Sequence, residues 1–236
     1  MPLMTEQTGK RLVETLSGPD GEVLYDAVHE VSSDNTLTTI SEEWHEEALQ
    51  RSNEQLLKGQ PLVLGTGSTA VAAAKLTWDI IKEGKAVGKS EDAKSAVLSA
   101  ADMDPLNYEG AKEGKSGTYT WEVNDSVTIF GKINYVTIKL RTEGKYGATP
   151  RADSKAPKGH YLPDVYVNVT QCKVNFPCSA SGSANLSNPS NIGRGDINTE
   201  VKVHAKLNAG WFAQHFGITV GFQATGTGGF KLLGKE

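Results

Sequence analysis

Two histidines in the C-terminal part of the chain, His204 and His215, have the residue type and spacing that could do chemistry. Both fall on the polar side of alternating segments. A tight turn that pairs Leu207 with Phe212 predicts that the two imidazoles face each other on the outer side of a hairpin. Facing imidazoles can bind a metal ion or titrate near neutral pH. No third ligand is near in sequence, so two solvated histidines are the alternative.

The two cysteines, Cys172 and Cys178, lie close together in the segment QCKVNFPCSA. This closeness allows a small disulfide loop, and two free thiols are the alternative interpretation. A single Cys-x5-Cys pair is not a zinc spacing. The chain has no Gly-x-Ser-x-Gly motif, and the segment ADMDPLNYEG lacks the later ligands of a calcium loop. We therefore expect no cofactor and no catalysis, with an enzyme built around the two histidines as one alternative.

The stretch LGTGSTAVAAAKLTWDIIKEGKAVGKS resembles a phosphate-binding loop at its start. Its first lysine, Lys75, lies too far along to reach a phosphate at a helix N-terminus. The stretch instead predicts a helix over 68–83, with a cap at Ser68 or Thr69 and an end at Gly84. This helix could pack on a sheet or enter a bilayer, and its candidate membrane-facing residues are Ala70, Ala73, Ala74, Ile80 and Ile81.

Several aromatic residues are candidates for membrane or ligand binding. Trp78 would suit a membrane interface. Tyr161 flanks a long predicted loop, and Trp211 and Phe212 stand at a predicted hairpin tip. Aromatic side chains at loop ends of a sandwich can bind glycans or lipid headgroups, and the alternative is that they close the open end of the sandwich.

The first part of the chain is predicted to be helical and acidic. Leu12, Val13 and Leu16 suggest a helix over 5–16, and a stronger helix is expected over 41–59 with Ser41 as its N-cap. A short helix is expected over 93–101. Residues 84–117 are rich in Gly, Lys, Ser and Ala, so we place a domain boundary at 117.

From Thr118 onward, apolar residues alternate with polar ones, which predicts six to eight antiparallel strands. A change of parity after Gln171 predicts a bulge, and 147–163 and 179–196 are predicted long loops. The expected fold class is α+β, with a mostly helical region over 1–117 and an antiparallel β-sandwich or partly closed barrel over 118–236.

The net charge is −4 and there is no basic run, so nucleic acid is not expected as a partner. No window is apolar enough for a spanning helix, and the start has no apolar signal core. The layout is similar to that of helix-plus-sandwich pore-forming toxins, although no motif carries the similarity. It implies a bacterial protein, secreted without a recognisable signal or cytoplasmic before delivery, that binds a membrane or cell-surface glycan and could form an oligomer. A structural or adaptor subunit of a larger assembly is the main alternative.

Overall fold

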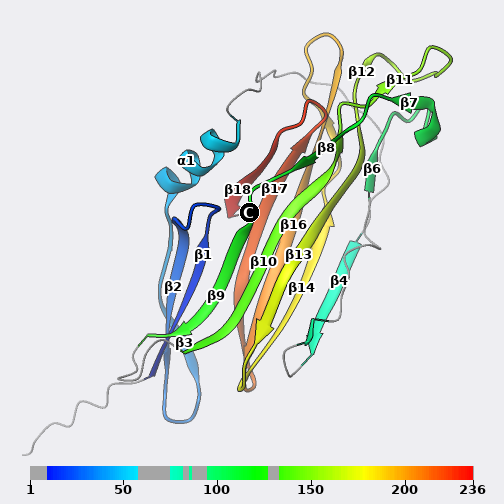
Figure 1. The fold of residues 1–236 in the computed structure, drawn as a ribbon. Helices are drawn as coiled ribbons and strands as arrows, with labels where there is room; N and C mark the ends of the chain where they lie inside the picture. Colours follow the sequence, from blue (N-terminus) through cyan, green and yellow to red (C-terminus); the bar gives the residue numbers. More distant parts are fainter. Residues whose placement is uncertain (1–9, 58–74, 82–84, 87–94, 127–132, 236) are drawn as a thin grey trace, which may run out of the picture.

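The computed structural model of the protein describes residues 10–57, 75–81, 85–86, 95–126 and 133–235. Over these residues the protein is mostly β, and two curled antiparallel sheets pack face to face along the long axis of the molecule (Figure 1). Each sheet has eight strands among the described residues. The sandwich expected for the C-terminal half is therefore present, but it is built from nearly the whole described chain.

The first sheet has the order β3-β2-β1-β9-β10-β13-β6, and β8 pairs with one end of β10. Its strands are β1 (Lys10–Ser17), β2 (Val23–Val31), β3 (Leu37–Trp44), β6 (Ser95–Val97), β8 (Lys112–Lys115), β9 (Tyr119–Asp125), β10 (Asn134–Tyr146) and β13 (Leu162–Val174).

The second sheet has the order β18-β17-β16-β14-β4-β5, and two short strands, β12 and β15, pair with β16. Its strands are β4 (Lys75–Ile81), β5 (Lys85–Ala86), β12 (Gly159–His160), β14 (Cys178–Leu186), β15 (Ser190–Asn191), β16 (Ile197–Trp211), β17 (Gln214–Thr225) and β18 (Phe230–Lys235). A separate two-stranded ladder and a 3-10 turn complete the upper end in Figure 1, formed by β7 (Tyr108–Glu109), β11 (Thr149–Pro150) and η2 (Pro105–Asn107).

One core lies between the two sheets. The predicted inward positions of β9, β10 and β16 are buried, because alternation places every second side chain on the inner face. Tyr119 of β9 meets Phe222 of β17 edge to face, with ring centroids 5.6 Å apart, and so joins the two sheets. Trp121, next inward along β9, is fully buried. The bulge predicted near Gln171 is confirmed, since the β10–β13 register shifts beside that residue.

The core also holds a polar network between β1, β2 and β9. The Glu14 carboxyl group is 1% exposed and accepts a hydrogen bond from the Trp121 indole nitrogen at 2.8 Å. Its other oxygen lies 3.0 Å from His29 Nε2, and His29 Nδ1 lies 3.0 Å from Thr39 Oγ1. The Phe216 ring of the opposite sheet packs against the imidazole at 4.7 Å. Each buried polar group of this network therefore has a partner.

The helix α1 (Glu46–Leu57) covers one open side of the sandwich, between β2 and β18. Ala48 and Leu49 are buried against the core. The Asn53 side-chain amide donates to the Leu232 carbonyl oxygen of β18 at 2.6 Å. Because β18 ends its sheet, this bond satisfies a backbone group that an edge strand leaves without a strand partner.

The predicted helical N-terminal region is wrong, and so is the α+β class. Of the helix expected over 5–16, the described residues 10–16 belong to β1, because Leu12, Glu14 and Leu16 all face inward with a period of two. The polar Glu14 concealed this alternation. Residues 10–44 give three strands of the same sheet that contains β9 and β10. The helix expected over 41–59 begins only at Glu46, since Ser41 lies in β3.

Three further expectations are corrected in the same direction. Of the helix predicted over 68–83, residues 75–81 form a strand, β4, which pairs with β14. Residues 68–74 and 82–83 lie outside the described residues. Thr, Trp and Ile favour a strand once a partner is present. The helix expected over 93–101 is replaced by β6, and the loop expected over 179–196 contains β14. No helix among the described residues is long and apolar enough to cross a membrane.

Candidate functional site: an aromatic cluster at one end of the sandwich

Two hairpin turns lie together at the lower end of the sandwich in Figure 1, between β13 and β14 and between β16 and β17. The second turn contains only Phe212 and Ala213, because Trp211 pairs with Gln214. The first turn is fastened to the start of β10, where the Asn175 amide donates to the Asn134 carbonyl oxygen at 2.8 Å. The strands thus fix both turns side by side.

Four aromatic rings form a continuous cluster from the core to the surface of this end. Tyr135 of β10 meets Trp211 of β16 edge to face, with centroids 5.2 Å apart. Trp211 in turn contacts Phe212 at 5.5 Å, and Phe212 contacts Phe176 at 6.4 Å, both close to perpendicular. Edge-to-face contacts between rings are favourable. The inner pair therefore supports the position of the outer pair.

The outer two rings are exposed and the inner two are buried. Phe176 is 87% exposed and Phe212 is 55% exposed, whereas Trp211 is only 2% exposed. Ile133, which directly precedes β10, adds a third large apolar side chain at this end and is 45% exposed. We name Ile133, Phe176 and Phe212 the apolar tip. An exposed apolar cluster of this kind is typical of an interaction surface.

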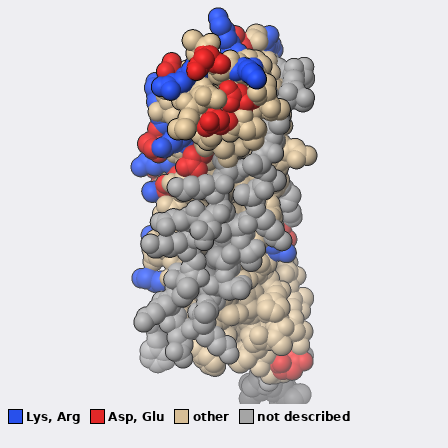
Figure 2. Space-filling view, turned by 90° about the vertical axis from the view of Figure 1, so that its right-hand side faces the viewer, with Lys and Arg blue, Asp and Glu red and all other residues tan. Residues whose placement is uncertain are grey.

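A lysine lies behind the apolar tip with its charge balanced. The Lys10 ammonium group donates to the Tyr135 hydroxyl at 2.6 Å and lies 3.5 Å from the Asp125 carboxylate. It also stands over the rings of Tyr135 and Trp211, at 4.8 and 4.6 Å from their centroids. Cation–π contact and the nearby carboxylate both stabilise the ammonium group. On the face shown in Figure 2, charged side chains of both signs gather toward the upper end, away from the apolar tip.

Phe212 adopts a backbone conformation that bulky residues avoid. Its φ angle is 51°, in the left-handed region where glycine and asparagine are preferred. This conformation costs about 1–2 kcal/mol for a residue with a side chain. A two-residue turn between long strands would therefore be more stable with glycine at this position. Strain of this type is concentrated at functional sites in proteins.

The predicted surface aromatics divide into different environments. Phe212 lies at a hairpin tip and is exposed, and Trp211 lies at the same tip but is buried beneath it. Tyr161 is fully buried in a small second core, where its hydroxyl donates to the Pro157 carbonyl oxygen at 3.0 Å and burial raises its pKa to about 12. Trp78, Ile80 and Ile81 belong to β4, whose side chains lie outside the described part of the structure, as do Ala70, Ala73 and Ala74.

Phe176 is the residue that sequence analysis missed as a surface aromatic. After the parity change at Gln171, the apolar alternation runs through Cys172, Val174 and Phe176, which would place Phe176 on the same face of a strand as Val174. Pro177 follows it, and a residue before proline is a frequent strand end. That signal would have placed Phe176 in a turn.

The predicted pair of facing histidines is wrong. His204 pairs with Gly221 and His215 pairs with Gly210, because the turn lies at Phe212 and Ala213 and not at 208–211. The segment Ala209–Trp211 is buried and continues β16. Among the described residues, no group of three or more His, Cys, Asp or Glu side chains could hold a metal ion.

Cys172 and Cys178 are free thiols on different sheets, so the disulfide alternative is wrong. Cys172 pairs with Ile138 in the first sheet, whereas Cys178 pairs with Trp211 in the second. Burial raises the pKa of the Cys172 thiol to about 11 and that of the Cys178 thiol to about 12. Both thiols are therefore protonated and unreactive near neutral pH.

Comparisons of this chain with protein-family models, with curated proteins and with solved structures gave no match. The fold and the site define the chain only as a two-sheet, mostly β protein with an aromatic end.

Proposed function

We propose that the protein is a non-catalytic binding protein that docks on a membrane surface through its apolar tip. The observation that carries this proposal is the pair of adjacent aromatic residues at the lower end of the sandwich, Phe176 and Phe212, which are 87% and 55% exposed. Aromatic rings at a protein end suit the boundary between lipid headgroups and acyl chains. The proposal does not require an anionic surface, since Lys10 already faces Asp125.

The expected affinity follows from the exposed rings. Moving a phenylalanine side chain fully out of water stabilises the bound state by about 1.5–3 kcal/mol. Losing both rings of the tip should therefore weaken binding about 100-fold or more, since 1.4 kcal/mol corresponds to a factor of ten. Pore formation by a helix over 68–83 is not part of this proposal, because residues 75–81 form β4.

The test is co-sedimentation of the protein with phosphatidylcholine vesicles, with and without an anionic lipid. Replacement of both Phe176 and Phe212 by Ala should abolish sedimentation at lipid concentrations that saturate the unaltered protein. Leu106→Ala is the matched control, because Leu106 is 77% exposed and lies at the opposite end, just before β7. No binding to either vesicle type, or equal loss in the Leu106 variant, would contradict membrane docking by the apolar tip.

A second variant separates binding from folding. Phe212→Gly removes the ring and relieves the left-handed strain at that position. We expect this variant to be more stable toward denaturant than the unaltered protein and to bind vesicles about tenfold more weakly. If stability and binding both fall, the ring supports the fold and is not held at the surface for docking.

A second candidate function, a subunit of a protein assembly, is favoured by β3. This strand ends its sheet, and its six middle residues are exposed, including Ile40 at 48%. A sheet edge of this kind can pair with a strand of another chain. The bulge that separates the β2–β3 pairs at Val28 and His29 restricts such pairing to short segments. Measurement of the mass in solution without lipid distinguishes this function, since a defined oligomer would support it.

A further inference from the structure

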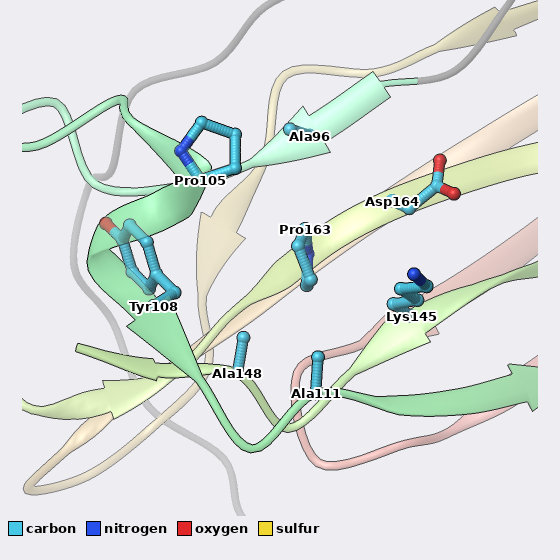
Figure 3. A pocket seen from close by; sticks show the side chains of 8 residues that line it. All are labelled: Ala96, Pro105, Tyr108, Ala111, Lys145, Ala148, Pro163 and Asp164. Carbon is cyan, nitrogen blue, oxygen red and sulfur yellow. The ribbon is translucent and has the colours of Figure 1, made fainter. Parts of the chain in front are cut away.

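A pocket at the upper end of the molecule, opposite the apolar tip, has the composition of a small-molecule site. Its volume is about 450 Å³, within the range of about 300–1,000 Å³ that is usual for ligand sites. It lies between the ends of β10 and β13 and the segment 96–111 (Figure 3). The side chains that line it are Ala96, Pro105, Tyr108, Ala111, Lys145, Ala148, Pro163 and Asp164.

One wall of the pocket is apolar and held in place by hydrogen bonds behind it. The Tyr108 hydroxyl accepts from the Ser99 backbone N–H at 3.1 Å and donates to the Asp102 carbonyl oxygen at 2.7 Å. These bonds point the hydroxyl away from the pocket, so the ring presents its apolar part (Figure 3). The ring also packs edge to face on Tyr161, with centroids 5.2 Å apart.

The loop that carries Pro105 and Tyr108 is tied to a neighbouring loop by one carboxylate. The Asp102 side chain accepts from Ser154 Oγ at 2.6 Å and from the Asn107 amide at 2.9 and 3.0 Å. The hydrogen bonds from Ser154 and Asn107 lower the pKa of Asp102 below its ordinary value. The pocket is therefore already formed without a ligand, which reduces the ordering that binding requires.

The opposite wall carries charges of both signs. Lys145 of β10 and Asp164 of β13 are directly paired across the two strands, so their side chains leave the same face of the sheet. Glu113 of β8 pairs with Lys145 on its other side, with 3.8 Å between ammonium nitrogen and carboxylate oxygen. Lys145 is 50% and Glu113 is 79% exposed, and exposed ion pairs of this kind add little stability. A ligand carboxylate can therefore replace Glu113 at the ammonium group.

We propose that this pocket binds a small zwitterion with an apolar body, of the class of free apolar α-amino acids. The ligand carboxylate contacts Lys145, its ammonium group contacts Asp164, and its side chain lies against Pro105, Tyr108 and Pro163. A zwitterion can place one charge beside each of these two side chains, because Lys145 and Asp164 are cross-strand neighbours. The small side chain of Ala111 leaves the space that the apolar body occupies. This inference concerns a different end of the molecule and does not rest on membrane docking.

The experiment is a titration of the full chain with leucine and with phenylalanine, followed by ligand-detected NMR. Each amino acid is compared with its N-acetyl form, which lacks the ammonium group, and with its amide, which lacks the carboxylate. We expect the free amino acids to bind and either blocked form to bind at least tenfold more weakly. Equal binding of free and blocked forms, or no saturation below about 10 mM, would overturn the proposal.

Variants at exposed or half-buried positions test the residues without disturbing the core. Lys145→Met and Asp164→Asn should each weaken binding tenfold or more. Ala111→Trp should abolish binding by filling the pocket, since Ala111 is exposed and lines it. Lys173→Met, an exposed lysine of β13 outside the pocket, is the matched control and should leave binding unchanged. Loss of binding in the Lys173 variant to the same extent would also overturn the assignment.

Discussion

Replacement of Glu14 by Ala should destabilise the protein more than almost any other exchange of a charged residue. Glu14 is 1% exposed and is the common acceptor for Trp121 Nε1 and His29 Nε2, at 2.8 and 3.0 Å. The Ala variant leaves the indole N–H and the imidazole nitrogen buried without this partner. A buried polar group that loses its partner costs about 1–3 kcal/mol. We therefore expect a loss of about 2–6 kcal/mol in the free energy of unfolding.

The measurement is urea denaturation followed by tryptophan fluorescence, because Trp121 is itself a member of the network. Glu14→Gln is the informative second variant. Its amide oxygen can accept from Trp121, and its amide nitrogen can donate to His29 when His29 Nδ1 carries the proton and donates to Thr39. We expect this variant to lose about half as much stability as Glu14→Ala, since neutral hydrogen bonds are roughly half as strong as charge-assisted ones.

Glu30→Ala is the control for the removal of a strand carboxylate. Glu30 lies on β2, one residue after His29, and is exposed. Its replacement should change stability by no more than about 0.5 kcal/mol, as is usual for surface sites. If Glu14→Ala and Glu30→Ala give the same unfolding midpoint, then Glu14 is not buried and β1 does not direct it toward the core. A helix over 5–16, as the sequence suggests, would give that result.

Two further predictions concern the thiols and the glycines. Burial raises the pKa values of Cys172 and Cys178 to about 11 and about 12. The native protein near pH 8 should therefore react with a thiol reagent far more slowly than free cysteine does. Rapid reaction of both thiols before unfolding would contradict their burial. Gly144→Ala should destabilise by about 3 kcal/mol, because an added Cβ would lie 2.0 Å from the Asp164 backbone oxygen. Gly21→Ala should lower the free energy of unfolding by only about 1 kcal/mol, since its φ is +81° but no atom lies within 4 Å of the added Cβ. Both variants are measured by urea denaturation. Similar losses of stability in the two would contradict the close approach of β10 to β13.

Five strands could be predicted from the sequence because apolar residues alternate with polar ones within each of them: β9, β10, β13, β16 and β17. In β16, for example, Val201, Val203, Ala205 and Leu207 alternate with polar residues, and all four are buried. β14 could not be predicted in this way. Apart from Leu186 at its end, it contains only small and polar residues, and its inner positions Ala180 and Ala184 pair with Ala209 and Ala205 of β16. Such a segment becomes a strand through its neighbours, not through its own propensity.

The candidate site was predicted in part for the same reason. The hairpin and the aromatic residues at its tip follow from local pattern, so Phe212 was found. The position of the turn decides which of Trp211 and Phe212 is exposed. The turn position depends in turn on the register between β16, which has 15 residues, and β17, which has 12. Phe176 joins the tip only because the β13–β14 turn lies beside the β16–β17 turn.

By itself, the sequence determined that the C-terminal half forms antiparallel strands with one apolar face, because a period of two in hydrophobicity has few other solutions. Tertiary structure decided where the N-terminal residues belong. Glu14 can occupy an inward position of β1 only because Trp121 and His29, distant in sequence or on another strand, supply its hydrogen-bond partners. Likewise, Lys145 and Asp164 come to line one pocket through the pairing of β10 with β13. Local propensity contains no information on such partners, since burial of a polar group is favourable only when the partner is in place.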